Sequence, residues 1–178
     1  NRFGHVSPTT ATAVIEELGN YLSKDDLVLD GGACDVGVES TIIDCTGDLP
    51  KILRPGAITA EMIQESTGLQ VVGSVEEPVI RVSGSLDSHY APVATVLLDQ
   101  PPVAGQGFIA PADVVTPPGA IRLASPQTTD EYARVLYSAL RAADAKGLSE
   151  VVVMQPIGPG IAVAIRDRLS KAATKPNE

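Results

Sequence analysis

The second half of the sequence alternates short apolar runs with longer segments whose apolar residues recur at helical spacing. The strand-like runs and helical segments are, in chain order, residues 93–98, 107–110, 120–123, 129–147, 150–154 and 160–173. Such alternation favours a parallel sheet packed against helices. We therefore expect residues 93–178 to form a small Rossmann-like three-layer α/β domain.

The composition agrees with a buried parallel sheet. Aromatic residues make up 3% of the chain and Trp is absent, so Val, Ile, Leu and Ala must fill the core. Strands of parallel sheets are buried on both faces and are rich in these aliphatic residues. With 178 residues, of which 44% are hydrophobic, the chain can build one domain or two small ones.

Charge and cysteine content exclude several classes of function. The net charge of -9 disfavours general nucleic-acid binding, which needs clustered Lys and Arg, and is typical of a soluble protein. Two cysteines, Cys34 and Cys45, are too few for a disulfide framework or a four-ligand zinc site, so we expect both to be buried and expect no protein-held metal. No apolar run has membrane-spanning length and no signal peptide is visible, so we expect no membrane association and a cytoplasmic location.

The first half also mixes helices and strands. Ser7 and Pro8 are typical of a helix start, so an amphipathic helix is predicted over residues 8–23. Thr59 and Gly68 bound a second predicted helix over residues 59–66. Short strands are predicted over residues 27–29, 41–43, 52–53 and 69–72.

Residues 73–92 have a different character from the segments on either side. They are rich in Gly, Ser and Pro and show no sustained period. The segment is interpreted as a linker or as a long loop with a functional role. We therefore divide the chain near residue 92.

The segment NRFGHVSPTT, residues 1–10, combines polar groups with a predicted helix start. The amide of Asn1 offers donors and an acceptor, and Ser7 lies where the helix is expected to begin. The N-terminus of a helix presents unpaired N–H groups that suit a phosphate. The alternative is an ordinary Ser-Pro cap without a ligand.

The segment GVEST, residues 37–41, places a hydroxyl where a loop enters a strand. Gly37 allows a close turn of the backbone, and the Ser40 hydroxyl suits the carboxylate or amine of a small substrate. The alternative is a structural role, in which Glu39 accepts hydrogen bonds from backbone N–H groups.

The segment LRPG, residues 53–56, ends a predicted strand with Arg54. Ligands in α/β sheets gather at strand ends, and a guanidinium suits bidentate phosphate contact. The alternative is a surface ion pair of Arg54 with Asp44 or Asp48.

In combination and order, these segments resemble the second half of the YrdC-like domain of L-threonylcarbamoyladenylate synthases. The resemblance rests on NRxGxVSPTT, DGGxxxxGVESTIID and ILRPGAIT, and covers residues 1 to about 72. SHYAP resembles the interdomain linker of the longer, two-domain members, and GIAVAIRDRLSKA resembles their closing helix. The implied organisation is the C-terminal half of a YrdC-like twisted open-sheet α/β domain (residues 1–73), a linker or lid (74–92) and a small α/β domain (93–178).

The resemblance implies a nucleotidyltransferase reaction. Members of this family make threonylcarbamoyl-AMP and pyrophosphate from L-threonine, bicarbonate and ATP, with Mg²⁺ as the metal of the nucleotide. A downstream threonylcarbamoyl transferase complex then modifies certain tRNAs with threonylcarbamoyladenosine. Positioning and charge neutralisation dominate this type of phosphoryl transfer.

The resemblance also assigns roles to individual positions. The implied residues are Asn1, Ser7, Arg54 and Ser83 for ATP, Ser40 for threonine, and His89 and Tyr90 for a lid over the site. The linker departs from the pattern PGMxYxHYAP, because Ser85 and Asp87 stand where many relatives have Met and Tyr. Lid contacts upstream of His89 are therefore not implied by the resemblance.

Other readings of the resemblance lead to different functions. The family's N-terminal half is not in this sequence, so we expect the chain alone to be catalytically inactive. One alternative is an RNA-binding YrdC-like module without synthase activity, with weak RNA binding. Another is the carbamoyl-transfer domain of hydrogenase maturation, although the linker and the second domain favour the synthase.

Overall fold

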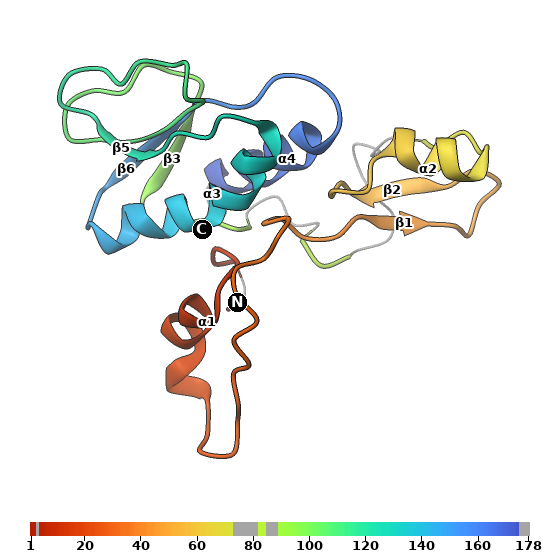
Figure 1. The fold of residues 1–178 in the computed structure, drawn as a ribbon, viewed down its shortest axis with the longest axis horizontal. Helices are drawn as coiled ribbons and strands as arrows, with labels where there is room; N and C mark the ends of the chain where they lie inside the picture. Colours follow the sequence, from red (N-terminus) through yellow and green to blue (C-terminus); the bar gives the residue numbers. More distant parts are fainter. Residues whose placement is uncertain (3, 73–81, 85–88, 175–178) are drawn as a thin grey trace.

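A computed structural model of the protein describes residues 1–2, 4–72, 82–84 and 89–174. It confirms the predicted α/β class (Figure 1). In chain order the elements are α1 (Ala11–Leu18), the 3-10 helix η1 (Gly19–Tyr21), β1 (Ile42–Asp44), β2 (Lys51–Arg54), α2 (Ala60–Thr67), β3 (Thr95–Leu98), β4 (Gly107–Ile109), β5 (Ile121–Ala124), α3 (Thr129–Ala145), β6 (Glu150–Val153) and α4 (Ile161–Ala173).

The second half forms a parallel sheet in the order β3-β6-β4-β5. Helices α3 and α4 cover one face, where Ile109 and Leu136 are completely buried. The opposite face carries Phe108, which packs with Val114 and Ala120 from the connecting loops, so loops form the layer on that side. Full burial of each large apolar side chain contributes about 1.5–3 kcal/mol. Because most of the fully buried apolar side chains lie in the second half, the main hydrophobic core of the described chain is there.

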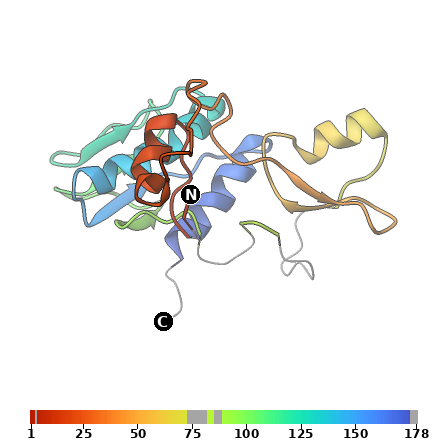
Figure 2. The same ribbon diagram turned by 90° about the horizontal axis from the view of Figure 1, so that it is seen from below.

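The first half contributes a hairpin and a short helix. Strands β1 and β2 are antiparallel, with Ile43 opposite Ile52. Helix α2 is capped as predicted: the Thr59 hydroxyl accepts a hydrogen bond from the Met62 N–H, and Gly68 ends the helix with a φ of 72°. The hairpin and α2 lie to one side of the four-stranded sheet in both views (Figures 1 and 2).

The first helix is shorter than predicted and begins at a different cap. Thr10 is the N-cap of α1, and its hydroxyl accepts from the Ala13 N–H at 3.1 Å. Ser7 is therefore not a helix cap, because its hydroxyl is bonded to Glu39 instead. The helix ends at Leu18 and continues only as the single turn η1, so the predicted extent of 8–23 was wrong.

Three further predictions for the first half were wrong. Leu27 and Leu29 do not form a strand and are 81% and 82% exposed, since no described segment pairs with them. The segment ending at Val72 makes a single bridge to Lys51 rather than a strand. Cys34 and Cys45 are exposed rather than buried, because both lie in surface loops.

Only parts of the predicted linker lie among the described residues. Val82–Gly84 and the stretch from His89 onward are described, while Ser85 and Asp87 lie outside the described residues. The Ala91 N–H donates to the Gly4 carbonyl at 3.0 Å, and the His89 N–H donates to the Lys171 carbonyl at 3.2 Å. The end of the linker is therefore held between the N-terminal segment and α4.

No helix in the described part of the chain combines the length and apolar character that crossing a membrane requires.

Candidate functional site

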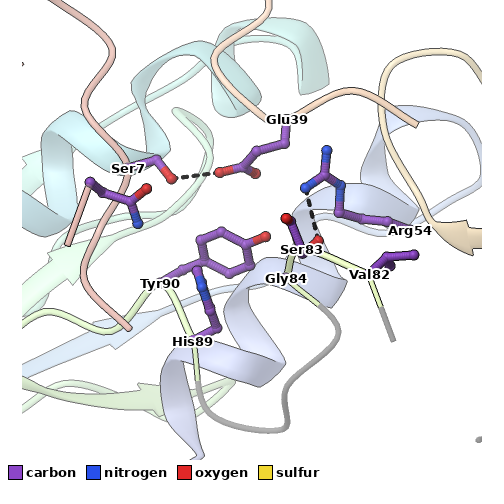
Figure 3. Close-up of a pocket in the computed structure, with 9 residues that line it drawn as sticks. Ser7, Glu39, Arg54, Val82, Ser83, Gly84, His89 and Tyr90 are labelled. Atoms are coloured by element: carbon purple, nitrogen blue, oxygen red, sulfur yellow. Dashed lines mark hydrogen bonds between the residues drawn. The ribbon is translucent and has the colours of Figure 1, made fainter. Parts of the chain in front are cut away.

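A pocket of about 370 Å³ lies where the linker meets the N-terminal segment and the end of β2 (Figure 3). This volume is within the range of small-molecule sites. Its lining comes from separate parts of the chain: Asn1, Ser7, Glu39, Arg54, Val82, Ser83, Gly84, His89 and Tyr90. Six of the seven residues singled out in the sequence thus line one pocket.

Arg54 is held rigidly at one side of the pocket. It ends β2 before Pro55, is 8% exposed, and donates from Nε to the Ser40 carbonyl at 3.0 Å. Its Nη1 donates to the Ser83 carbonyl at 2.9 Å, and its Nη2 donates to Ser40 Oγ at 3.3 Å. The alternative of a surface ion pair with Asp44 or Asp48 is wrong, because the guanidinium is buried against neutral oxygens.

Ser40, the predicted threonine contact, lies beside the pocket rather than in its lining. Its side chain is exposed, and its hydroxyl is one of the acceptors for Arg54. Ser40 lies in the loop before β1 and Arg54 is the last residue of β2. Arg54 therefore joins Ser40 to the linker residue Ser83.

Glu39 is the centre of a hydrogen-bond network that spans both halves of the chain. Its Oε1 accepts from the Ser7 hydroxyl at 2.6 Å. Its Oε2 accepts from the Tyr137 hydroxyl and from Arg168 Nε, both at 2.7 Å. The alternative that Glu39 accepts from backbone N–H groups is wrong, since these partners are side chains from the N-terminal segment, α3 and α4.

This network keeps the Glu39 carboxylate ionised. Burial acts to raise its pKa, but hydrogen bonds from Arg168, Ser7 and Tyr137, together with the charge of Arg168, outweigh burial and lower the pKa. Burial raises the pKa of the Tyr137 phenol, so this hydroxyl remains a donor. The pocket therefore contains a fixed negative charge with a buried positive charge behind it.

Tyr90 is packed between the pocket and the C-terminal domain. Its backbone φ is 61°, in the left-handed region, and its side chain is 2% exposed. The ring stacks on Tyr137 with centroids 5.8 Å apart, and the Arg168 guanidinium lies 5.2 Å from its centroid. Gly84 lies against the Tyr90 hydroxyl so closely that a Cβ at position 84 would overlap it.

His89 faces the same pocket, and its ring lies edge-on to Tyr90 with centroids 4.1 Å apart. Burial lowers the pKa of its imidazole, Glu39 acts to raise it, and the positive charges of Lys171, Arg168 and Arg54 lower it further. The imidazole is therefore neutral at neutral pH.

Asn1 and Ser83 complete the pocket. The Asn1 side chain donates to the His5 carbonyl at 2.8 Å, which orients the amide at the pocket rim. Ser83 contributes its carbonyl to Arg54 and lies next to Gly84 in the lining.

Sequence reasoning missed the contribution of the C-terminal domain. Tyr137 and Arg168 hold Glu39 from α3 and α4, far away in sequence. One signal was present for Arg168: it follows Ile165 by three positions and precedes Leu169, so it lies on the apolar face of its helix. An Arg on such a face is buried only when it is paired.

The arrangement suits a ligand that carries an anionic group and several polar groups. Around one cavity it offers a guanidinium, a neutral imidazole, an amide and three hydroxyls, beside the Glu39 carboxylate. Among the described residues, no three His, Cys, Asp or Glu side chains are grouped so as to hold a metal ion.

Comparisons with known proteins find similar sequences and a similar fold among threonylcarbamoyl-AMP synthases. A family model described as "Threonylcarbamoyl-AMP synthase, C-terminal domain" matches residues 58–174, and one described as "Telomere recombination" matches residues 1–56. The fold is similar to a crystal structure of Pyrococcus abyssi Sua5 complexed with L-threonine, with a TM-score of 0.75 at 27% identity. That alignment covers 97% of this chain and 56% of the other.

Curated relatives include threonylcarbamoyl-AMP synthases of Pyrococcus abyssi and Bacillus subtilis, each 30% identical over 97% of this chain. A synthase of Schizosaccharomyces pombe is 43% identical over 52% of the chain and 24% of its own length. The chain spans about half the length of the relatives it matches, 56% of the first and 55% of the second. Because one synthase model spans residues 58–174 and two synthases align over nearly the whole chain, this chain belongs to the threonylcarbamoyl-AMP synthase family.

Proposed function

We propose that the protein carrying this chain makes threonylcarbamoyl-AMP from L-threonine, bicarbonate and ATP, and that the chain supplies part of the pocket for ATP and threonine. One observation carries the proposal. The N-terminal segment, β2 and the linker bring Asn1, Ser7, Arg54, Ser83, His89 and Tyr90 to one cavity of suitable volume.

The chemistry is the formation of a mixed anhydride. Bicarbonate loses hydroxide to give carbon dioxide, and the amine of threonine adds to it with loss of a proton, so that a carbamate and water form. A carbamate oxygen then attacks the α-phosphorus of ATP. A P–O bond forms to the carbamate, the bond to the β-phosphate oxygen breaks, and pyrophosphate leaves with the electron pair. The product passes to a threonylcarbamoyl transferase complex that modifies tRNA, and we place these steps in the cytoplasm.

Arg54 and Ser7 are the proposed contacts to the nucleotide, with Asn1 and Ser83 beside them. A rigidly held guanidinium stabilises the charge that moves between phosphate oxygens. The Ser7 hydroxyl proton is directed at Glu39 Oε1 in the free protein. Donation to a phosphate therefore requires this hydroxyl to turn toward the ligand.

Ser40 is the proposed threonine contact. Its hydroxyl lies within 3.3 Å of Arg54 Nη2, so threonine bound at Ser40 lies next to the guanidinium that contacts ATP. The P. abyssi relative is described as complexed with L-threonine, which supports threonine as the amino-acid substrate. Proximity of the two substrates is the main catalytic contribution that we assign to this part of the site.

His89 and Tyr90 are the proposed lid. Tyr90 stacks on Tyr137 of α3 and lines the pocket, so this end of the linker is already in place beside the site. Exclusion of water protects a mixed anhydride from hydrolysis. The domain division at residues 73 and 92 is part of the same proposal, since the linker then joins the hairpin lobe to the four-stranded domain.

Magnesium belongs to the nucleotide in this proposal. Among the described residues that line the pocket, Glu39 is the one carboxylate, and three side chains already donate to it. A Mg²⁺ ion bound through phosphate oxygens and water needs no cage of carboxylates from the chain.

The test uses the protein expressed from its complete coding sequence. Pyrophosphate release from ATP is measured with threonine and bicarbonate, and then with each omitted. We expect release only when both are present, and a marked loss of release in Arg54→Met. Equal release without threonine would refute the proposed function.

A further inference from the structure

Arg168 is a buried cation of the C-terminal domain that reaches the pocket wall. It lies on α4 with a fully buried side chain. Its Nε donates to Glu39 Oε2 at 2.7 Å, and its Nη1 donates to Asp167 Oδ2 at 2.6 Å. Its guanidinium also lies over the ring of Tyr90. One residue of the C-terminal domain thus touches two residues of the pocket lining.

Glu39 poses an electrostatic problem for the proposed ligand. Its side chain lines the cavity and is 21% exposed, so an ionised carboxylate faces the space that an anionic ligand would occupy. The Glu39 carboxylate and an anionic ligand in the same cavity repel each other, and this repulsion disfavours binding strongly where water is excluded. The hydroxyl proton of Ser7 is directed at Glu39 as well, and is not available to the ligand while that bond is made.

We propose that Arg168 is a positioning residue for this pocket: it cancels the charge of Glu39 from behind and thereby sets the affinity of the pocket for an anionic ligand. The inference rests on the proposed function for the identity of that ligand, the triphosphate of ATP. Arg168 touches no part of the cavity itself, so it acts through Glu39 and Tyr90. The C-terminal domain then contributes to nucleotide binding without contacting the nucleotide.

The charge relationship can be measured without any substrate. The chain contains two histidines, His5 and His89, and only His89 lines the pocket. Proton NMR titration of the imidazole signals therefore reports the pocket potential at His89, with His5 as a reference for an intact fold. The variants are R168M, E39Q and the double variant R168M/E39Q. The matched control is R166M, since Arg166 lies on the same helix and donates to the Pro156 carbonyl.

We expect the pKa of His89 to rise in R168M, because Glu39 is then uncompensated, and to fall in E39Q. In the double variant it returns toward the wild-type value, and in R166M it stays there. If R168M does not fold, the pKa of His89 is compared between E39Q and the double variant. These two proteins differ only at position 168, so the comparison shows whether the charge of Arg168 acts on the pocket. The same pKa of His89 in both would overturn the inference.

A second measurement connects the charge to the ligand. In the complete protein, R168M is expected to raise the KM for ATP by about tenfold and the KM for threonine much less. Addition of E39Q is expected to restore the KM for ATP. An equal rise of both KM values, not restored by E39Q, would assign Arg168 a purely structural role. If wild-type protein releases no threonine-dependent pyrophosphate, the proposed function fails, while the His89 titration still decides the charge relationship.

Discussion

Arg54 donates two hydrogen bonds to Ser40, from Nε to the main-chain carbonyl at 3.0 Å and from Nη2 to the hydroxyl at 3.3 Å. This pair connects the end of β2 to the loop that carries Glu39. The third hydrogen bond of Arg54 extends the connection to the linker at Ser83. The proposed nucleotide contact is therefore also a structural contact of the pocket.

Arg54→Met removes these part-buried hydrogen bonds and leaves the carbonyl oxygens of Ser40 and Ser83 without their donor. We expect a loss of about 1–3 kcal/mol in the free energy of unfolding of the chain, measured by urea denaturation. Lys51→Met is the control, since Lys51 is exposed on the same strand. Equal denaturation midpoints for the two variants would contradict this role of Arg54.

Gly37→Ala tests the close packing of the GVEST loop on α3. Gly37 has a φ of 83°, and an added Cβ would overlap the backbone at Ala133 and Arg134. Because a helix backbone cannot yield, we expect a loss of about 3 kcal/mol in the free energy of unfolding. Gly32→Ala has a similar φ of 89° with open space around it, so it is expected to lose only about 1 kcal/mol.

Gly84→Ala tests whether the position of Tyr90 matters for activity. The added methyl group would overlap the Tyr90 hydroxyl, so the tyrosine must move away from the pocket. We expect threonine-dependent pyrophosphate release by the complete protein to fall about tenfold or more. Gly68 has a φ of 72° and open surroundings, so Gly68→Ala strains only the local backbone. This variant is expected to keep its activity. Similar activities of the two variants would exclude a role for the seated Tyr90.

The lowered pKa of Glu39 predicts that the free energy of unfolding depends on pH in the acid range. Its pKa is lower in the folded chain than the ordinary value of 4.5, because the donors around it outweigh the effect of burial. The unfolded chain therefore binds this proton more tightly, and acid favours unfolding. The contribution is complete above pH 4.5 and disappears as the pH falls through the lowered pKa.

The measurement compares the free energy of unfolding of wild-type chain and Glu39→Gln between about pH 7 and about pH 3. Wild type is expected to lose more stability than the variant over the acid part of this range. Glu16→Gln, at an exposed position of α1, serves as the control and should follow wild type. Parallel curves for wild type and Glu39→Gln would show that folding does not lower the pKa of Glu39.

The elements that were predicted correctly depend on residues close in sequence. The caps of α2, Thr59 and Gly68, act on backbone groups within a few positions, so their effect is visible in the sequence alone. The strands and helices of the second half follow from periodic apolar patterns for the same reason. Ser7 and Thr10 show the limit of this approach, because both are good caps and a distant contact with Glu39 decides between them.

Long-range contacts explain what the sequence did not reveal. Leu27 and Leu29 have the composition of a strand, but a strand also needs a partner, and they remain exposed. The network around Glu39 joins residues separated by 98 and 129 positions, to Tyr137 and Arg168 respectively. No local pattern contains such a pairing, whereas six of the seven site residues implied by family resemblance do line one pocket.

The way in which the N-terminal segment is held determines when the pocket can form during folding. Its Val6 carbonyl accepts from Arg141 of α3, 135 residues away, and its Gly4 carbonyl accepts from Ala91. Closure of such long loops is slow, and these contacts stabilise the closed loop only after α3 has formed. Residues 1–7 leave the ribosome before α3 is made, yet they cannot dock until it has folded. The pocket is therefore completed at the end of folding, and the C-terminal domain is the template on which it is assembled.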